Sequence, residues 1–188
     1  MTSRWLVEVA PQRDLDIQWK SISLLFKNEP PEDSDYYGPV LTTHKQLRVF
    51  ESVLADEGNE AAGEFYTELG RRIHHDQDRD FDVADALSAV GIDTRHAAAL
   101  DDESWDTKIR TAMDDGLGLV GQDVGTPIIA FENASGVRNG IFGPVISRRP
   151  TGDDVVGLWD GMAAMMNVDG FWELKRTRVE GPDFGERP

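Results

Sequence analysis

Cysteine is absent from all 188 residues of this chain. A chain without cysteine forms no disulfide bond, offers no thiolate nucleophile, and supplies no sulfur ligand to zinc or to an iron–sulfur cluster. Chemistry that needs a thiol from the protein is therefore excluded for these residues as they stand.

Positive charge is scarce as well, with 19 Lys and Arg against 35 Asp and Glu and a formal net charge of −16. Nucleic acid phosphates and anionic lipids both require clustered positive charge, so the composition argues against either partner. No apolar run approaches the roughly 18 residues of a membrane span. The first segment carries Arg4 and Glu8, unlike a secretory signal. We therefore expect a cytoplasmic protein.

Hydrophobic periodicity predicts a mixed order of helices and strands. The segment from Thr2 to Ala10 has apolar residues at helical spacing and is expected to stop at Pro11. Alternation of apolar and polar residues from Leu15 toward Leu25 predicts a strand. Further helices are expected over 47–58, 65–73, 82–90, 95–100 and 105–113, followed by a hairpin of strands 128–131 and 141–145 and a final helix over 151–166.

This order matches a thioredoxin-like α/β fold if one additional strand precedes it. The elements then read as βαβ, an all-helical insertion, and ββα. We expect a discontinuous thioredoxin-like domain of residues 1–40 and 121–178, an inserted helical domain of residues 41–120, and a loose tail of residues 179–188.

Several patterns suggest sites but lack the surroundings that those sites need. The G-x-G-x-x-G run at 116–121 follows a predicted helix and precedes a strand, the reverse of a dinucleotide site, so its glycines are expected to end the helix. The alternate aspartates of 76–82 resemble a calcium loop, but Phe81 and Leu87 stand where Gly and Glu are required. We expect no metal site, and nothing in the sequence places a histidine beside a nucleophile.

The tripeptide Gly125-Thr126-Pro127 is the strongest local signal for a binding site. A small or hydroxylated residue before a proline that opens a strand is typical of the cis-proline loop of thioredoxin folds. The backbone of that loop can pair with an extended thiol substrate. We therefore predict that these three residues bind substrate.

Taken together, the sequence resembles the DsbA-like thioredoxin-fold oxidoreductases, and among them the mycothiol-dependent nitroreductase family. The similarity runs in order along nearly the whole chain. The stretches that carry it are Thr2-Ser3-Arg4-Trp5, Arg71-Arg72-Ile73-His74, Asp123-Val124-Gly125-Thr126-Pro127, residues 142–148 (FGPVISR) and residues 173–178 (ELKRTR).

The resemblance implies redox chemistry that these residues lack. In that family a first strand leads into Cys-Pro-Trp-Cys-Trp, and the Thr-Ser-Arg-Trp run follows almost at once. Here that run begins at Thr2, so the expected cysteine pair and strand would lie before Met1, and no catalytic residue is expected within this chain. The hypothesis is a start codon placed downstream of the true one, or a truncated gene.

The resemblance also implies a cosubstrate and further site residues. No bound cofactor is expected, and mycothiol or a similar low-molecular-weight thiol would supply electrons to a disulfide or nitro substrate. Asn28 matches a polar position near the active site, although a turn former before Pro30 is an equal interpretation. A nearby tyrosine would correspond to Tyr36 or Tyr37.

Three functions follow as alternatives. The first is a thiol-disulfide oxidoreductase, inactive as written because it has no thiol, with a possible homodimer formed through an unpaired central strand. The second is a redox-dead thioredoxin-fold module that binds peptides or a partner beside Pro127. The third is an unrelated acidic helical scaffold. The coding sequence upstream separates the first two.

Overall fold

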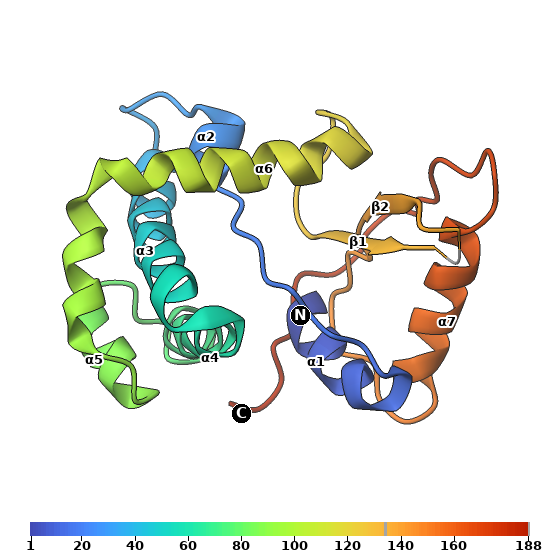
Figure 1. Cartoon of the computed structure of the whole chain (residues 1–188), viewed down its shortest axis with the longest axis horizontal. Helices are drawn as coiled ribbons and strands as arrows, with labels where there is room; N and C mark the ends of the chain where they lie inside the picture. Colours follow the sequence, from blue (N-terminus) through green and yellow to red (C-terminus); the bar gives the residue numbers. More distant parts are fainter. Residues whose placement is uncertain (134, 188) are drawn as a thin grey trace. The chain divides into compact units, whose positions relative to one another are not determined.

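The computed structural model describes residues 1–133 and 135–187 (Figure 1). It forms two compact units. The sheet unit consists of Met1–Ile17 and Gly116–Glu186, and the helical unit consists of Gln18–Asp115 with Arg187. No helix in the described part of the chain has both the length and the apolar character needed to cross a membrane.

The sheet unit is built on the predicted hairpin. Strands β1 (Ile128–Glu132) and β2 (Arg138–Phe142) pair antiparallel, with Ile128 opposite Phe142. The second strand begins three residues earlier than the sequence predicted, because the Asn133 side chain accepts from the N–H groups of Ser135 and Val137 and closes the turn sooner. The result is a small two-stranded sheet in a mixed structure, consistent with the predicted α/β class.

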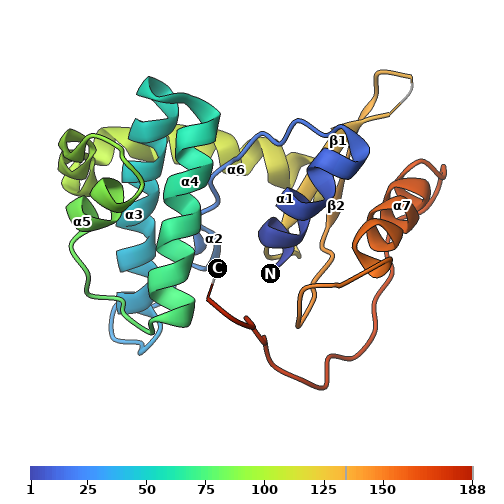
Figure 2. The same ribbon diagram turned by 90° about the horizontal axis from the view of Figure 1, so that it is seen from below.

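Two helices of the sheet unit, α1 (Thr2–Arg13) and α7 (Asp154–Met166), pack on one face of this hairpin (Figure 2). Their shared core is apolar, and Trp159 lies 6.4 Å from Trp5 and 5.9 Å from Phe131 between ring centroids. In α7, the apolar residues Val155, Met162 and Met166 lie at helical spacing and form its buried face. The core consists of Trp5, Val9, Ile129, Val155, Met162 and Met166.

Pro11 does not stop α1, which continues to Arg13. The prediction was wrong because a proline in the last turn removes only one hydrogen bond. The residue four positions earlier, Val7, is 44% exposed, so water can solvate its carbonyl. Arg13 also joins α1 to α7, since its guanidinium donates to both carboxylate oxygens of Asp160 at 2.7 and 2.6 Å.

The strand predicted from Leu15 toward Leu25 is not formed. Residues 15–23 have no regular structure and lead into the short helix α2 (Leu24–Asn28). A strand needs a ladder partner, and the two strands of the described residues pair with each other. Side chains of the helical unit hold this segment in place. The backbone N–H of Trp19 donates to Asn59 Oδ1 at 2.8 Å, and the Ser21 hydroxyl donates to the Glu51 carboxylate at 2.5 Å.

The helical unit is a bundle around α3 (Tyr37–Asp56) and α4 (Gly58–Gly70), which lie side by side in both views (Figures 1 and 2). The chain continues through the π-helical turn η1 (Arg71–His75) and α5 (Val83–Ala89). Two 3-10 segments, η2 (Thr94–Asp101) and η3 (Glu103–Trp105), then lead into α6 (Asp106–Val120).

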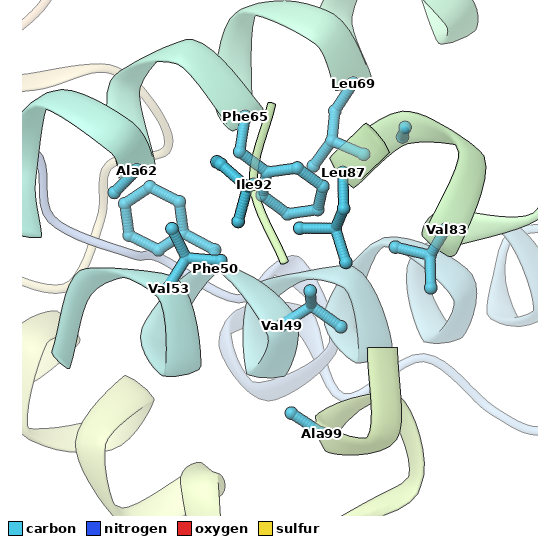
Figure 3. Packing of buried hydrophobic residues seen from close by; sticks show 11 residues of the cluster. Val49, Phe50, Val53, Ala62, Phe65, Leu69, Val83, Leu87, Ile92 and Ala99 are labelled. Atoms are coloured by element: carbon cyan, nitrogen blue, oxygen red, sulfur yellow. The ribbon is translucent and has the colours of Figure 1, made fainter. Parts of the chain in front are cut away.

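An apolar core fills the helical unit, as Figure 3 shows. Phe65, Val49 and Leu87 are fully buried at its centre. The remaining members are Phe50, Val53, Ala62, Leu69, Val83, Ala86, Ile92 and Ala99.

The two units differ from the predicted domains at three places. Residues 18–40 belong to the helical unit, because Ser23 and Phe26 contact His44 of α3. The last residues of α6, from Gly116, belong to the sheet unit. The predicted loose tail has no regular structure but is tied at Glu180, which pairs with Arg148, and at Asp183, whose N–H donates to the Ser147 carbonyl.

Candidate functional site

The loop before β1 contains the three residues predicted to bind substrate in the sheet unit. The Thr126–Pro127 peptide bond is cis. Thr126 is exposed, while Gly125 and Pro127 are half-buried. Neither the N–H nor the carbonyl of Thr126 hydrogen bonds to another residue of the described chain. Both groups are therefore available to an extended ligand.

A second loop, at Gly143–Pro144, holds the loop at Thr126–Pro127 in place. The Gly143 N–H donates to the Pro127 carbonyl at 2.8 Å, directly after the last pair of the hairpin ladder. The Gly143–Pro144 bond is also cis, which no sequence pattern indicated. Gly143 has φ of 108°, a backbone conformation that favours glycine, so a side chain at this position would be strained.

The start of α1 is joined to this second loop. Thr2 is 7% exposed, and its hydroxyl donates to the Pro144 carbonyl at 2.8 Å. Deeper in the helix, the Trp5 indole N–H donates to the Val155 carbonyl at 2.7 Å. A chain of hydrogen bonds therefore connects the N-terminus of α1 through Pro144 and Gly143 to Pro127.

The N-terminus of α1 is electropositive. Its first turn contains no acidic residue, and no side chain caps it. The unpaired N–H groups and the helix dipole place partial positive charge at this end. Burial, and then the charge of Arg4, lower the pKa of the Met1 amino group. Such an end stabilises an anion, including a thiolate.

Asn28 lies in the helical unit, at the end of α2. Its side-chain amide donates to the Tyr36 hydroxyl over 3.5 Å, a long and weak hydrogen bond. Tyr36 is 46% exposed, and Tyr37 begins α3. Of the two tyrosines named from the sequence, Tyr36 is therefore the one that contacts Asn28.

A family model described as Rv2466c-like, mycothiol-dependent nitroreductase Rv2466c, matches residues 1–176. The chain belongs to this family. The match confirms the family that the sequence resembles, and at the level of the family it supports a thiol-dependent oxidoreductase. The Rv2466c-like match includes α1, the hairpin and both proline loops, so the whole site described above lies within it.

This Rv2466c-like chain also contains two buried contacts that sequence reasoning missed. Ser23 Oγ lies 2.9 Å from His44 Nδ1, and His44 Nε2 lies 3.2 Å from Asp106 Oδ1. Ser52 Oγ lies 2.8 Å from His96 Nδ1 in the same way. No sequence motif marks either pair, because the serine and histidine are 21 and 44 positions apart.

The first of these clusters has the residue types of a catalytic triad but not its accessibility. Ser23 is fully buried, and its oxygen already accepts the Phe26 N–H as the cap of α2. That oxygen also shares a hydrogen bond with His44 Nδ1, and the imidazole tautomer sets which of the two groups donates. His44 Nε2 is close to Asp106 but forms no hydrogen bond with good geometry. The cluster positions α2 against α3 and has no room for a substrate at the hydroxyl.

Burial favours the neutral form of His44. Burial lowers the pKa of His44, and the charge of Arg48 adds to this, while Asp106 opposes it. Burial raises the pKa of Asp106, but hydrogen bonds from Arg48 and its charge outweigh this, so the pKa is lowered overall. Arg48 donates to both Asp106 oxygens, at 2.7 and 2.9 Å.

The patterns rejected as nucleotide or calcium sites have structural roles. Gly121, with φ of 85°, ends α6, as predicted for this glycine, whereas Gly116 and Gly118 lie inside the helix. Asp82 caps α5 through the Ala84 N–H, and Asp76 pairs with Arg187. Within residues 1–133 and 135–187, no three His, Asp or Glu side chains are grouped to hold a metal ion.

Proposed function

We propose that this chain is the scaffold of a thiol-dependent oxidoreductase with a thioredoxin-like fold of the DsbA type. It passes electrons from a low-molecular-weight thiol, mycothiol by family, to a disulfide or nitro compound. The observation that carries the proposal is the hydrogen-bonded link between the electropositive start of α1 and the Thr126–Pro127 loop, in a member of the Rv2466c-like family. A cytoplasmic setting, where such thiols stay reduced, is part of the proposal.

The proposed roles follow from the contacts of each group. The start of α1 stabilises a thiolate, and the free N–H and carbonyl of Thr126 pair with the backbone-like part of a thiol substrate. Within the helical unit, Asn28 and Tyr36 are proposed to bind substrate through their polar ends, as the family resemblance implies. Gly125, which is half-buried, is proposed to bind substrate as the first residue of the Thr126–Pro127 loop.

The reaction with a disulfide proceeds by two exchanges. A thiolate attacks one sulfur of the substrate, forming a mixed disulfide and releasing the other sulfur as a thiolate that takes up a proton. A second thiol then attacks the mixed disulfide and releases the second product thiol. The two thiols are oxidised to a disulfide and the substrate is reduced to two thiols. None of the sulfur atoms comes from these 188 residues.

The test compares three proteins in a reductase assay with mycothiol as the electron donor. The 188-residue chain is expected to show no turnover. A version extended at its N-terminus by a strand and Cys-Pro-Trp-Cys-Trp is expected to show turnover, and its Ser-Pro-Trp-Ser-Trp counterpart is the matched control. Turnover by the 188-residue chain itself would contradict the mechanism.

The alternative is a redox-dead thioredoxin-fold module that binds an extended partner at Thr126. The free backbone groups of that residue favour this interpretation equally. It predicts that the cysteine-bearing version stays inactive and that no Cys-Pro-x-Cys is encoded upstream. A homodimer is a further proposal, tested by light scattering.

A further inference from the structure

The helical unit contains a cavity of about 270 Å³ that is separate in sequence from the proline loops. Its walls come from α3, from the segment that leads into α5, and from η2. The residues that line it are Thr42, Lys45, Gln46, Arg79, Phe81, Asp82, Val83 and Leu100. This space is large enough for one small organic molecule.

Gln46 is the unusual member of this lining. Its side chain is only 6% exposed, yet it makes no hydrogen bond to any residue that the structure describes. The Gln46 amide is not among the described side-chain groups that are sealed from solvent without a partner, so its polar atoms open onto the cavity and can be solvated there. Because Gln46 lines the cavity, a ligand inside it is the natural partner for the amide.

The charges around the cavity favour an anion. Lys45 pairs with Asp101 at 2.6 Å, and the Asp82 carboxylate accepts the Ala84 N–H, so these two groups are already engaged. Arg79 makes no ion pair or hydrogen bond within the described residues. In a chain with a net charge of −16, this guanidinium is a local positive group that can form bidentate hydrogen bonds with a carboxylate.

The rest of the wall is apolar and backed by the core. Val83 is 7% exposed and belongs to the buried cluster, where Figure 3 shows it near Leu87. Phe81 and Leu100 are partly buried against the same cluster. The Arg72 guanidinium lies 5.1 Å from the Phe81 ring centroid and helps to hold that ring. A flat apolar group would find contacts here.

We propose that this cavity binds a small hydroxylated aromatic carboxylate. Its carboxylate pairs with Arg79, its ring packs on Phe81 and Val83, and its hydroxyl hydrogen bonds with the Gln46 amide. This site involves no thiol and no residue of the proline loops, so it does not depend on the redox function.

The experiment titrates the full 188-residue chain with 4-hydroxybenzoate, by calorimetry and by amide chemical shifts. Saturable binding is expected, with shifts centred on Lys45, Gln46 and Phe81. Arg79→Gln is expected to weaken binding about tenfold or more, because a charge-assisted hydrogen bond is lost. Lys108→Gln removes an exposed cation of the same unit outside the cavity and is expected to leave binding unchanged.

A second pair of comparisons tests the amide and the charge separately. Gln46→Leu is expected to weaken 4-hydroxybenzoate about fivefold and to leave benzoate, which has no hydroxyl, unchanged. Its far-UV spectrum and melting temperature show whether the variant is folded. No saturable binding at about 10 mM would overturn the proposal, since even a Kd in the millimolar range would be visible there. Equal binding of 4-hydroxybenzyl alcohol, or equal effects of the two cation variants, would overturn it as well.

Discussion

Replacing Gly63 by alanine should destabilise the helical unit although it adds only one carbon atom. A Cβ atom at Gly63 of α4 would lie 2.6 Å from Trp19 Nε1 and 3.0 Å from Trp19 Cδ1. The indole cannot easily retreat, because it also packs on Tyr66 with ring centroids 5.7 Å apart. The backbone of Trp19 is fixed through Asn59. The Gly63→Ala variant must therefore displace a packed ring.

Two opposing contributions determine how much Gly63→Ala changes the free energy of unfolding. Alanine is favoured over glycine inside a helix by about 1 kcal/mol. Forcing an additional carbon into a packed contact costs about 1–3 kcal/mol. We expect Gly63→Ala to lower the free energy of unfolding by about 1 kcal/mol overall, with displacement of the ring deciding the sign.

Gly70 provides the matched control. It belongs to the same helix, has φ of −63° and ψ of −37°, and a Cβ there meets nothing within 4 Å. Gly70→Ala is therefore expected to stabilise the helical unit by about 0.5–1 kcal/mol. Urea unfolding followed by far-UV circular dichroism compares the two variants, and similar stabilisation by both would refute the packing argument.

A double-mutant cycle assigns the effect to the ring. In a Trp19→Leu background the carbon at position 63 no longer meets an indole, so Gly63→Ala should become neutral or stabilising. We expect a coupling energy of about 1–2 kcal/mol between the two positions. A coupling near zero would mean that the cost arises elsewhere in the bundle.

Two further predictions concern buried polar contacts. Trp5→Phe removes the indole donor to the Val155 carbonyl, along with part of a fully buried ring, and should cost about 2 kcal/mol in urea unfolding. Trp172→Phe changes a ring that is 88% exposed and should stay within about 0.5 kcal/mol, so equal losses would count against the Trp5 contact. The pKa of His44 is lowered by burial, so below its ordinary value of 6.5 the unfolded chain binds more protons than the folded chain. Stability should therefore fall as the pH drops below about 6.5, and His44→Gln should flatten this part of the profile. An unchanged profile in that variant would exclude His44 as its source.

Local signals in the sequence located several features that the structure contains. Proline and glycine mark the hairpin and the loop at Pro127, and the spacing of Val155, Met162 and Met166 identifies the buried face of α7. These features depend on residues within one or two turns of each other. Periodicity and turn chemistry are local properties, so they can be read from the sequence.

Long-range partners could not be read in the same way. The alternation from Leu15 predicted a strand, but a strand forms only when another strand pairs with it. In the structure, the side chains of Asn59 and Glu51 accept hydrogen bonds from this segment instead. The bond from Thr2 to Pro144 joins residues 142 positions apart. No spacing rule predicts such a contact, because it depends on how the elements pack.

The candidate site contains the groups proposed to bind and align a substrate, and it contains them without the cysteines that would transfer electrons. The electropositive start of α1, the Thr2 contact and the Pro127 loop are built entirely from backbone groups and one hydroxyl. None of these contacts needs a thiol in order to form. Under the proposed function, the fold would supply anion stabilisation and substrate alignment, and the added sulfur would supply electron transfer. We therefore predict that cysteines added to this scaffold work without any rearrangement of the loops, and that the proposed binding at Thr126 persists in their absence.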